Sequence, residues 1–180
     1  DWIVTVDPHT HRIPSLDALF TIPAAAASAG AAIADWLARN VANPAIVGPD
    51  EESEQWVAPI ATALGAPWTT LRKERRGDRD VTVTLTRPLP MRDHTPVVVD
   101  DIVSSGETIR AAVDAIAAHC ACAPVVVCTH ALFAPGADDA LRGAARVVSA
   151  NTVAHATNAV DVAPAIVDAV RQLTEGAAAR

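Results

Sequence analysis

Short apolar runs alternate along the chain with longer segments in which apolar residues recur every three or four positions. The short runs are typical of buried strands, and the longer segments have the spacing of amphipathic helices. Such alternation predicts βαβ units, so we expect an α/β fold with a mainly parallel β-sheet and helices on both faces. Strands are expected at 2–6, 45–48, 67–71, 81–85, 96–100, 124–129 and 146–150, and helices at 24–40, 51–64, 105–119, 137–143 and 163–174.

One connection departs from this pattern, because the segment 72–80 between two expected strands contains no apolar residue. It predicts a protruding β-hairpin flap, and exposed loops often carry function. Lys73 and Arg75 would lie on the same side of an extended chain, with Gly77 as a hinge. A closing cationic loop can stabilise the charge that develops during phosphoryl transfer. The alternative is that the run is only a solvated surface.

The stretch 97–109 is the best candidate for a binding centre, because a β-branched run leads into hydroxyl residues and then into a helical pattern. The start of a helix offers unpaired N–H groups and a partial positive charge, which favour a phosphate. Hydroxyl groups can add donors, and a glycine lets the backbone approach closely. We therefore predict a phosphate site at Ser104, Ser105, Gly106 and Thr108, with Glu107 as a further ligand-binding residue.

Asp100 and Asp101 come directly before this loop, at the predicted carboxyl edge of the sheet, where open α/β folds bind ligands. Two adjacent carboxylates would repel a phosphate. We expect them to bind the vicinal hydroxyls of a sugar or a hydrated divalent cation instead. A strand-to-helix turn capped by Asp and Ser is the alternative, but capping does not explain the paired acids.

Asp7-Pro8-His9 follows the first expected strand and is predicted to project from the same edge of the sheet. A carboxylate and an imidazole at this spacing could hold Mg²⁺ and contact phosphate oxygens, with His11 and Arg12 assisting. The alternative is a turn in which Asp7 caps a loop and Pro8 stops the strand. Asp50, at another strand end, could reach a second Mg²⁺ or a ribose, although helix capping explains it as well.

Composition excludes several other classes of function. The formal net charge is −7, so no basic excess is present to neutralise a nucleic-acid backbone. No apolar run is long enough to span a membrane, and the odd number of cysteines suits a reducing, cytoplasmic setting. Cys128 and His130 would share one face of a strand, but the spacing of Cys120 and Cys122 is unlike that of zinc knuckles. The GxSxG and Walker motifs are missing from the sequence.

The segment VVVDDIVSSGET at 97–108 resembles the ribose-5-phosphate loop of type I phosphoribosyltransferases and of ribose-phosphate pyrophosphokinases, which make phosphoribosyl pyrophosphate (PRPP). TVDPHTHR at 5–12, VGPDEESEQW at 47–56, RKERRGDRDV at 72–81 and NTVAHATNAVDVAP at 151–164 favour the second family. The resemblance matches the later part of that family's chain. Ser104 stands where many members have a third Asp, and Glu107 stands where Gly is common.

The resemblance implies a type I phosphoribosyltransferase-like domain over 1–180, preceded by an upstream ATP-contacting domain, in a cytoplasmic homo-oligomer. It implies transfer of the diphosphoryl group of MgATP to ribose 5-phosphate. His9 would contact the metal-bound triphosphate, Lys73 and Arg75 would be catalytic, and Asp7, His9, Asp100 and Asp101 would be the metal candidates. Two alternatives remain: a phosphoribosyltransferase that uses PRPP, and a non-catalytic regulatory subunit. The joint presence of His9, Lys73 and Arg75 argues against the regulatory subunit.

Overall fold

The computed structural model describes residues 1–10, 13, 15–75 and 81–178. Its strands are β1 (Ile3–Val6), β2 (Ala24–Ala27), β3 (Pro44–Gly48), β4 (Trp68–Arg75), β5 (Val81–Leu85), β6 (Thr95–Val103), β7 (Val125–Ala131), β8 (Arg146–Ala150) and β9 (Asn158–Val160). Its helices are the short 3-10 helix η1 (Leu16–Ala18) and the helices α1 (Gly30–Asn40), α2 (Glu54–Leu64), α3 (Glu107–Ala117), α4 (Ala137–Ala140) and α5 (Ala163–Ala178). Within the described residues, every helix is too short or too polar to cross a bilayer.

The main sheet has seven strands in the order β5-β4-β3-β6-β7-β8-β9. All neighbouring pairs are parallel except β4 and β5, which form an antiparallel hairpin. The predicted α/β fold with a mainly parallel sheet is therefore confirmed. The hairpin is also confirmed, but β4 continues to Arg75, so that the first part of the expected polar connection is strand.

Two apolar clusters cover the two faces of the main sheet. One contains Ile33 and Leu37 of α1 and Ile60 of α2, together with Val97 and Val99 of β6. The other contains side chains of α3, such as Ile109 and Ile116, together with Val98 of β6. Successive residues of β6 therefore point to opposite faces, as the pleat of a strand requires. Burial on both faces explains why this strand is an almost continuous apolar run.

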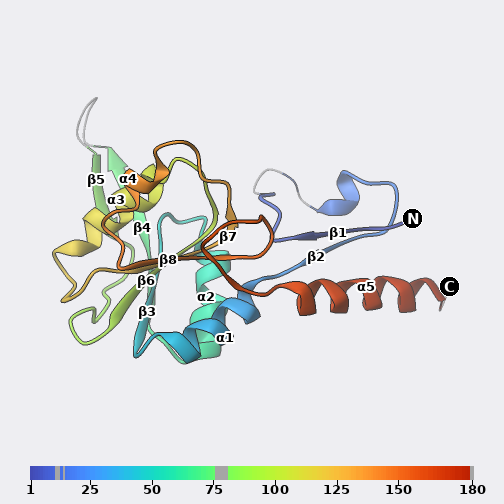
Figure 1. The fold of residues 1–180 in the computed structure, drawn as a ribbon, viewed down its shortest axis with the longest axis horizontal. Coiled ribbons are helices and arrows are strands. Elements are labelled where there is room, and N and C mark those ends of the chain that lie inside the picture. Colours follow the sequence, from blue (N-terminus) through green and yellow to red (C-terminus); the bar gives the residue numbers. More distant parts are fainter. Residues whose placement is uncertain (11–12, 14, 76–80, 179–180) are drawn as a thin grey trace.

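The first strand lies outside the main sheet, which corrects the prediction that it shares the carboxyl edge of that sheet. β1 pairs in parallel with β2, from Ile3 opposite Ala24 to Val6 opposite Ala27, and the pair forms a separate two-stranded sheet. Figure 1 shows this small sheet and α5 side by side, extending away from the main sheet. The helix expected at 24–40 is therefore wrong over 24–27, and α1 begins only at Gly30.

Candidate functional site

An open cleft of about 270 Å³ lies at the carboxyl ends of β3 and β6. Five residues that the sequence analysis singled out line it together: His9, Asp50, Asp100, Asp101 and Thr108. β6 continues to Val103, three residues beyond its expected end, so both acids lie inside the strand and not after it. The cleft joins the acidic pair, the start of α3 and the segment that follows β1, which is an arrangement suited to a ligand with both hydroxyl and anionic groups.

Asp101 and His9 form a direct pair across this cleft. The Nδ1 atom of His9 lies 2.7 Å from Oδ2 of Asp101, although the two residues are 92 positions apart. Oδ1 of Asp101 accepts a hydrogen bond of 2.8 Å from the backbone N–H of Ile102. The Asp101 side chain is 7% exposed, whereas the His9 side chain is 45% exposed. Asp101 is thus a buried acceptor, and His9 is the member of the pair that solvent or a ligand can reach.

Asp7 is a buried residue that ties the end of β1 to the rest of the molecule. Its Oδ2 atom accepts hydrogen bonds from the backbone N–H of Ala29 at 2.9 Å and from the hydroxyl of Thr129 at 3.2 Å. Its φ angle of 35° lies in the left-handed region, which Asp tolerates better than most residues. In addition, Nε2 of His130 lies 3.0 Å from the carbonyl oxygen of Val6. The segment that carries His9 is therefore fixed to β7 of the main sheet.

Asp100 has an unfavourable electrostatic environment. Burial raises its pKa to about 8, and the carboxylates of Asp101 and Asp50 add to the rise. Asp100 also lines a small cavity of about 30 Å³ together with Asp7, Ser28 and Thr129. A cation beside Asp100 would offset the repulsion between its carboxylate and those of its neighbours, because an opposite charge favours the ionised form.

The hydroxyl loop leads from β6 into α3. Gly106 precedes the helix with a φ angle of 78°, and a Cβ atom at this position would lie 2.9 Å from the Cβ of Ala140. Ser104 and Ser105 are exposed, while Thr108 reaches the cleft. Glu107 forms an ion pair with Arg110 in the first turn of α3, so its carboxylate is directed along the helix. The predicted phosphate loop therefore requires glycine at position 106, because any side chain there would be strained and would collide with Ala140.

The β4–β5 hairpin, which carries Lys73 and Arg75, lies beside β3. Lys73 is exposed on β4, and Arg75 is the last residue of that strand. The neighbouring Arg72 contacts Glu51 at 2.7 Å, at the start of the segment that leads into α2. Gly77, His11 and Arg12, which were also assigned roles from the sequence, lie outside the described residues.

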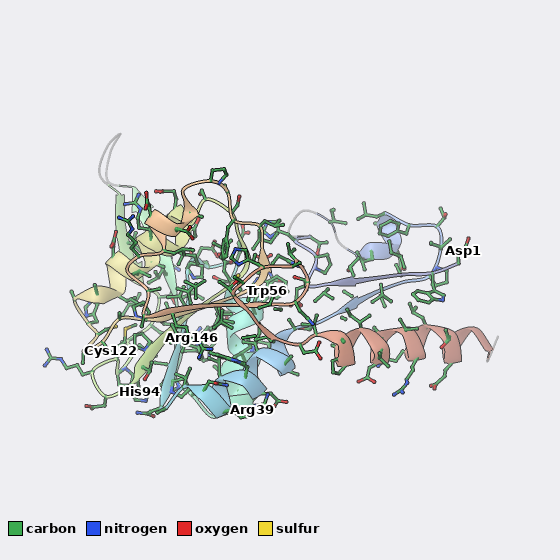
Figure 2. The ribbon with its side chains drawn as sticks, in the orientation of Figure 1. Asp1, Arg39, Trp56, His94, Cys122 and Arg146 are labelled. Carbon is green, nitrogen blue, oxygen red and sulfur yellow. The ribbon has the colours of Figure 1, made fainter. Side chains whose placement is uncertain are left out.

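The sequence pattern did not single out Glu52, Ser53, Gln55 and Trp56 as cleft residues. Figure 2 shows Trp56 near the centre of the molecule, where the main sheet meets the extension formed by β1, β2 and α5. Ser53 is buried, and its hydroxyl contacts the Oδ1 atom of Asp50 at 2.9 Å. In the sequence, these residues only follow a predicted strand end at the start of a helix. Helix capping explains polar residues at that position equally well.

The oxygen donors of the cleft suit Mg²⁺, which usually binds through one or two carboxylates together with substrate phosphates and water. Among the described residues, no group of three or more His, Cys, Asp and Glu side chains is placed to hold a metal by itself. Of the four metal candidates, Asp7 lines only the small cavity, His9 and Asp101 line only the cleft, and Asp100 lines both. Cys128 is buried in the core, where burial raises the pKa of its thiol to about 12.

A mainly parallel sheet with an acidic pair and a loop before a helix at its carboxyl edge is the arrangement in which open α/β folds bind their ligands. The model of the phosphoribosyl transferase domain matches residues 15–166, and the chain belongs to that family. It is similar to the ribose-phosphate pyrophosphokinase of Methanopyrus kandleri, with 29% identity over 97% of this chain and 60% of the relative. The corresponding protein of Streptomyces coelicolor is 30% identical over 97% of this chain and 57% of the relative.

Solved structures confirm the fold. The crystal structure of phosphoribosylpyrophosphate synthetase from Mycobacterium smegmatis matches with a TM-score of 0.76 and 22% identity, over 98% of this chain and 59% of that chain. An adenine phosphoribosyl transferase from Trypanosoma brucei, solved in complex with AMP, pyrophosphate and ribose-5-phosphate, matches with a TM-score of 0.53 and 16% identity over 72% of this chain and 66% of that chain. The chain thus spans about 57–60% of the length of the pyrophosphokinase relatives described above.

Proposed function

We propose that this chain takes part in ribose-phosphate diphosphokinase catalysis, in which the diphosphoryl group of ATP moves to the C1 hydroxyl of ribose 5-phosphate and gives PRPP and AMP. The observation that carries the proposal is the meeting of His9, the acidic pair of β6 and the start of α3 in one cleft. The similarity to ribose-phosphate pyrophosphokinases over 97% of the chain supports the same activity.

The 5-phosphate of the sugar would bind at residues 104–108, where the start of α3 supplies N–H groups and Ser104, Ser105 and Thr108 supply hydroxyl groups. The acidic residue Asp100 would accept hydrogen bonds from the ribose hydroxyls. The loop at residues 104–108 and the Asp100 carboxylate would then hold opposite ends of the sugar phosphate, with the C1 hydroxyl directed toward the open cleft. Positioning of this kind lowers the barrier of a transfer reaction without a covalent intermediate.

The anionic ATP phosphates would be oriented by His9, while Lys73 and Arg75 would stabilise the charge on the group in transfer. Mg²⁺, when bound, would neutralise part of the phosphate charge, with Asp100 as the carboxylate best placed to hold it. Asp101 and Asp7 are less accessible to the ion because both are buried and hydrogen-bonded. We also expect the full-length protein to be a homo-oligomer, as the family resemblance implies.

Incubation of the full-length protein with MgATP and ribose 5-phosphate tests the proposal. We expect AMP and PRPP to appear in equal amounts, measured by chromatography. Consumption of PRPP with a nucleobase, without any formation of PRPP from ATP, would instead identify a phosphoribosyltransferase. Binding of ribose 5-phosphate without turnover of either substrate would indicate a regulatory subunit.

A further inference from the structure

We propose that Asp101 is a positioning residue that acts through His9. The inference rests on the proposed function, because the ligand that His9 contacts is taken to be the polyphosphate. It assigns different roles to two adjacent acids that the sequence treats as equivalent.

The hydrogen bonds of Asp101 are the first argument. Both carboxylate oxygens already have a partner within the protein: Oδ2 lies 2.7 Å from Nδ1 of His9, and Oδ1 accepts from the N–H of Ile102 at 2.8 Å. Each oxygen can accept a second hydrogen bond, but the contact with His9 and the contact with Ile102 together fix the direction of the carboxylate. Asp101 is also only 5% exposed, so little of its surface can be reached from the cleft.

The way the His9 segment is held is the second argument. Asp7 binds Ala29 and Thr129, and the carbonyl oxygen of Val6 lies 3.0 Å from His130, so the backbone just before His9 is fixed from the opposite side. The pair with Asp101 then sets the direction of the ring itself. A backbone anchor together with a ring anchor leaves the imidazole few alternative orientations, which is how a positioned catalytic group is built.

The identity of the bonded ring nitrogen gives the chemical consequence. A carboxylate that only accepts hydrogen bonds requires Nδ1 of His9 to carry the hydrogen, and this is the tautomer that the proposal assigns. A ring hydrogen bond from His9 to a ligand must then be made by Nε2. Fixing the tautomer and direction of an imidazole through its other nitrogen is a common role of carboxylates in enzyme sites.

Asp101→Asn is the sharpest variant, because it keeps the shape of the side chain and replaces one acceptor oxygen by a donor group. The amide has one oxygen for two hydrogen-bond donors, the N–H of Ile102 and Nδ1 of His9. We expect the oxygen to stay with the adjacent backbone N–H, so that the NH₂ group faces the ring and shifts the hydrogen from Nδ1 to Nε2. Asp101→Ala is the second variant and removes the ring contact altogether.

The ring state can be read without any substrate, by ¹⁵N NMR of histidine-labelled full-length protein at pH 8.5, where an imidazole is ordinarily neutral. His9→Gln assigns the signal. We expect the wild-type ring to carry its hydrogen on Nδ1 and the ring in Asp101→Asn to carry it on Nε2. An unchanged tautomer in both Asp101→Asn and Asp101→Ala would overturn the proposal.

Kinetics provide the second test. We expect Asp101→Asn to lower kcat by about 10–100-fold, as is usual for residues that orient a site histidine, and to leave the KM for ribose 5-phosphate unchanged. In a His9→Ala background, Asp101→Asn should have no further effect, whereas Ser104→Ala should reduce turnover by the same factor as in wild type. A raised KM for ribose 5-phosphate with a normal kcat would show instead that Asp101 is a ribose ligand.

The proposed function and the positioning role of Asp101 can be disproved separately. If the wild-type protein makes no PRPP, the proposed function is wrong, and the tautomer measurement still decides whether Asp101 orients His9. If the protein makes PRPP and the tautomer of His9 does not depend on Asp101, only the positioning role is wrong.

Discussion

Two groups of candidate residues at the same edge of the sheet differ in how the protein holds them. The anchored group consists of Asp7, His9 and Asp101, whose side chains have hydrogen-bond partners within the chain. The exposed group consists of Lys73, Ser104 and Ser105, whose side chains face solvent. The fold therefore fixes the acidic and imidazole side of the site before any ligand arrives and leaves the proposed phosphate side open. Substitutions in the first group should therefore disturb the protein's own hydrogen bonds, whereas substitutions in the second should affect only the handling of ligands.

The largest expected effect belongs to the exposed group. In the full-length protein, Lys73→Ala should lower kcat about 10²–10³-fold and change KM little, because a cation that acts only as charge develops stabilises the transition state. The free energy of unfolding should stay within about 0.5 kcal/mol of the wild-type value, as is usual for surface changes. Steady-state kinetics and urea denaturation measure the two quantities.

Arg72→Ala is the matched control, since Arg72 is the adjacent cation of β4 and contacts Glu51. It should leave kcat near the wild-type value. A change in KM alone for Lys73→Ala would make Lys73 an ordinary phosphate ligand. If neither parameter changed, the hairpin would be the solvated surface that its composition also allows.

Asp100 tests what burial beside other carboxylates does, because its hydrogen bond from the backbone N–H of Asp101, at 3.0 Å, does not offset burial and the charges of Asp101 and Asp50. Its pKa of about 8 in the folded state lies above the ordinary value of 3.8 in the unfolded chain, so the folded state retains a proton that the unfolded state releases between these values. The free energy of unfolding should therefore fall as the pH rises from about 4 to about 8, and the penalty should be absent at lower pH. Asp100→Asn cannot ionise and should lack this loss.

The difference between wild type and Asp100→Asn should grow by on the order of 3 kcal/mol between pH 5 and pH 8. Urea denaturation at several pH values in the presence of EDTA measures it. Parallel stability profiles for the two proteins would show that the Asp100 carboxyl is solvated in the folded protein. Added Mg²⁺ should reduce the difference near pH 8 if the ion binds at this carboxylate.

Asp7 represents the anchored group. Asp7→Ala should lower the free energy of unfolding by about 2–3 kcal/mol, because the N–H of Ala29 and the hydroxyl of Thr129 lose their acceptor inside the protein. The left-handed backbone at position 7 adds strain for any residue other than Gly, Asn or Asp. Thermal and chemical denaturation measure the loss.

Asp7→Asn is the control, because it retains an acceptor oxygen and tolerates the backbone conformation, and it should cost about 1 kcal/mol. A stable Asp7→Ala protein that binds Mg²⁺ more weakly would contradict the anchoring role and restore Asp7 as a metal ligand.

The sequence predicted six of the seven strands of the main sheet and the hairpin, because each depends on a local pattern, but it missed the three-residue strand β9. It misassigned residues 24–27, since four alanines favour a helix by propensity and only the pairing with β1 makes them a strand. The contact between His9 and Asp101 was also beyond reach, because no spacing rule relates residues 92 positions apart. Equally, the pattern could not distinguish a carboxylate that binds protein, such as Asp7, from one that faces a cleft.

The smallest effects are expected in the hydroxyl loop. Ser104→Ala and Ser105→Ala should each weaken the binding of ribose 5-phosphate by about fivefold, since one hydroxyl hydrogen bond contributes about 1 kcal/mol and the N–H groups of α3 remain. Both side chains are exposed, so the melting temperature should not change. Isothermal titration with ribose 5-phosphate and with ribose separates the phosphate contribution from that of the sugar, because the affinity for ribose should be the same in all three proteins. Equal losses for the two ligands would place these hydroxyls at the sugar, and the open side of the site would then no longer be its phosphate side.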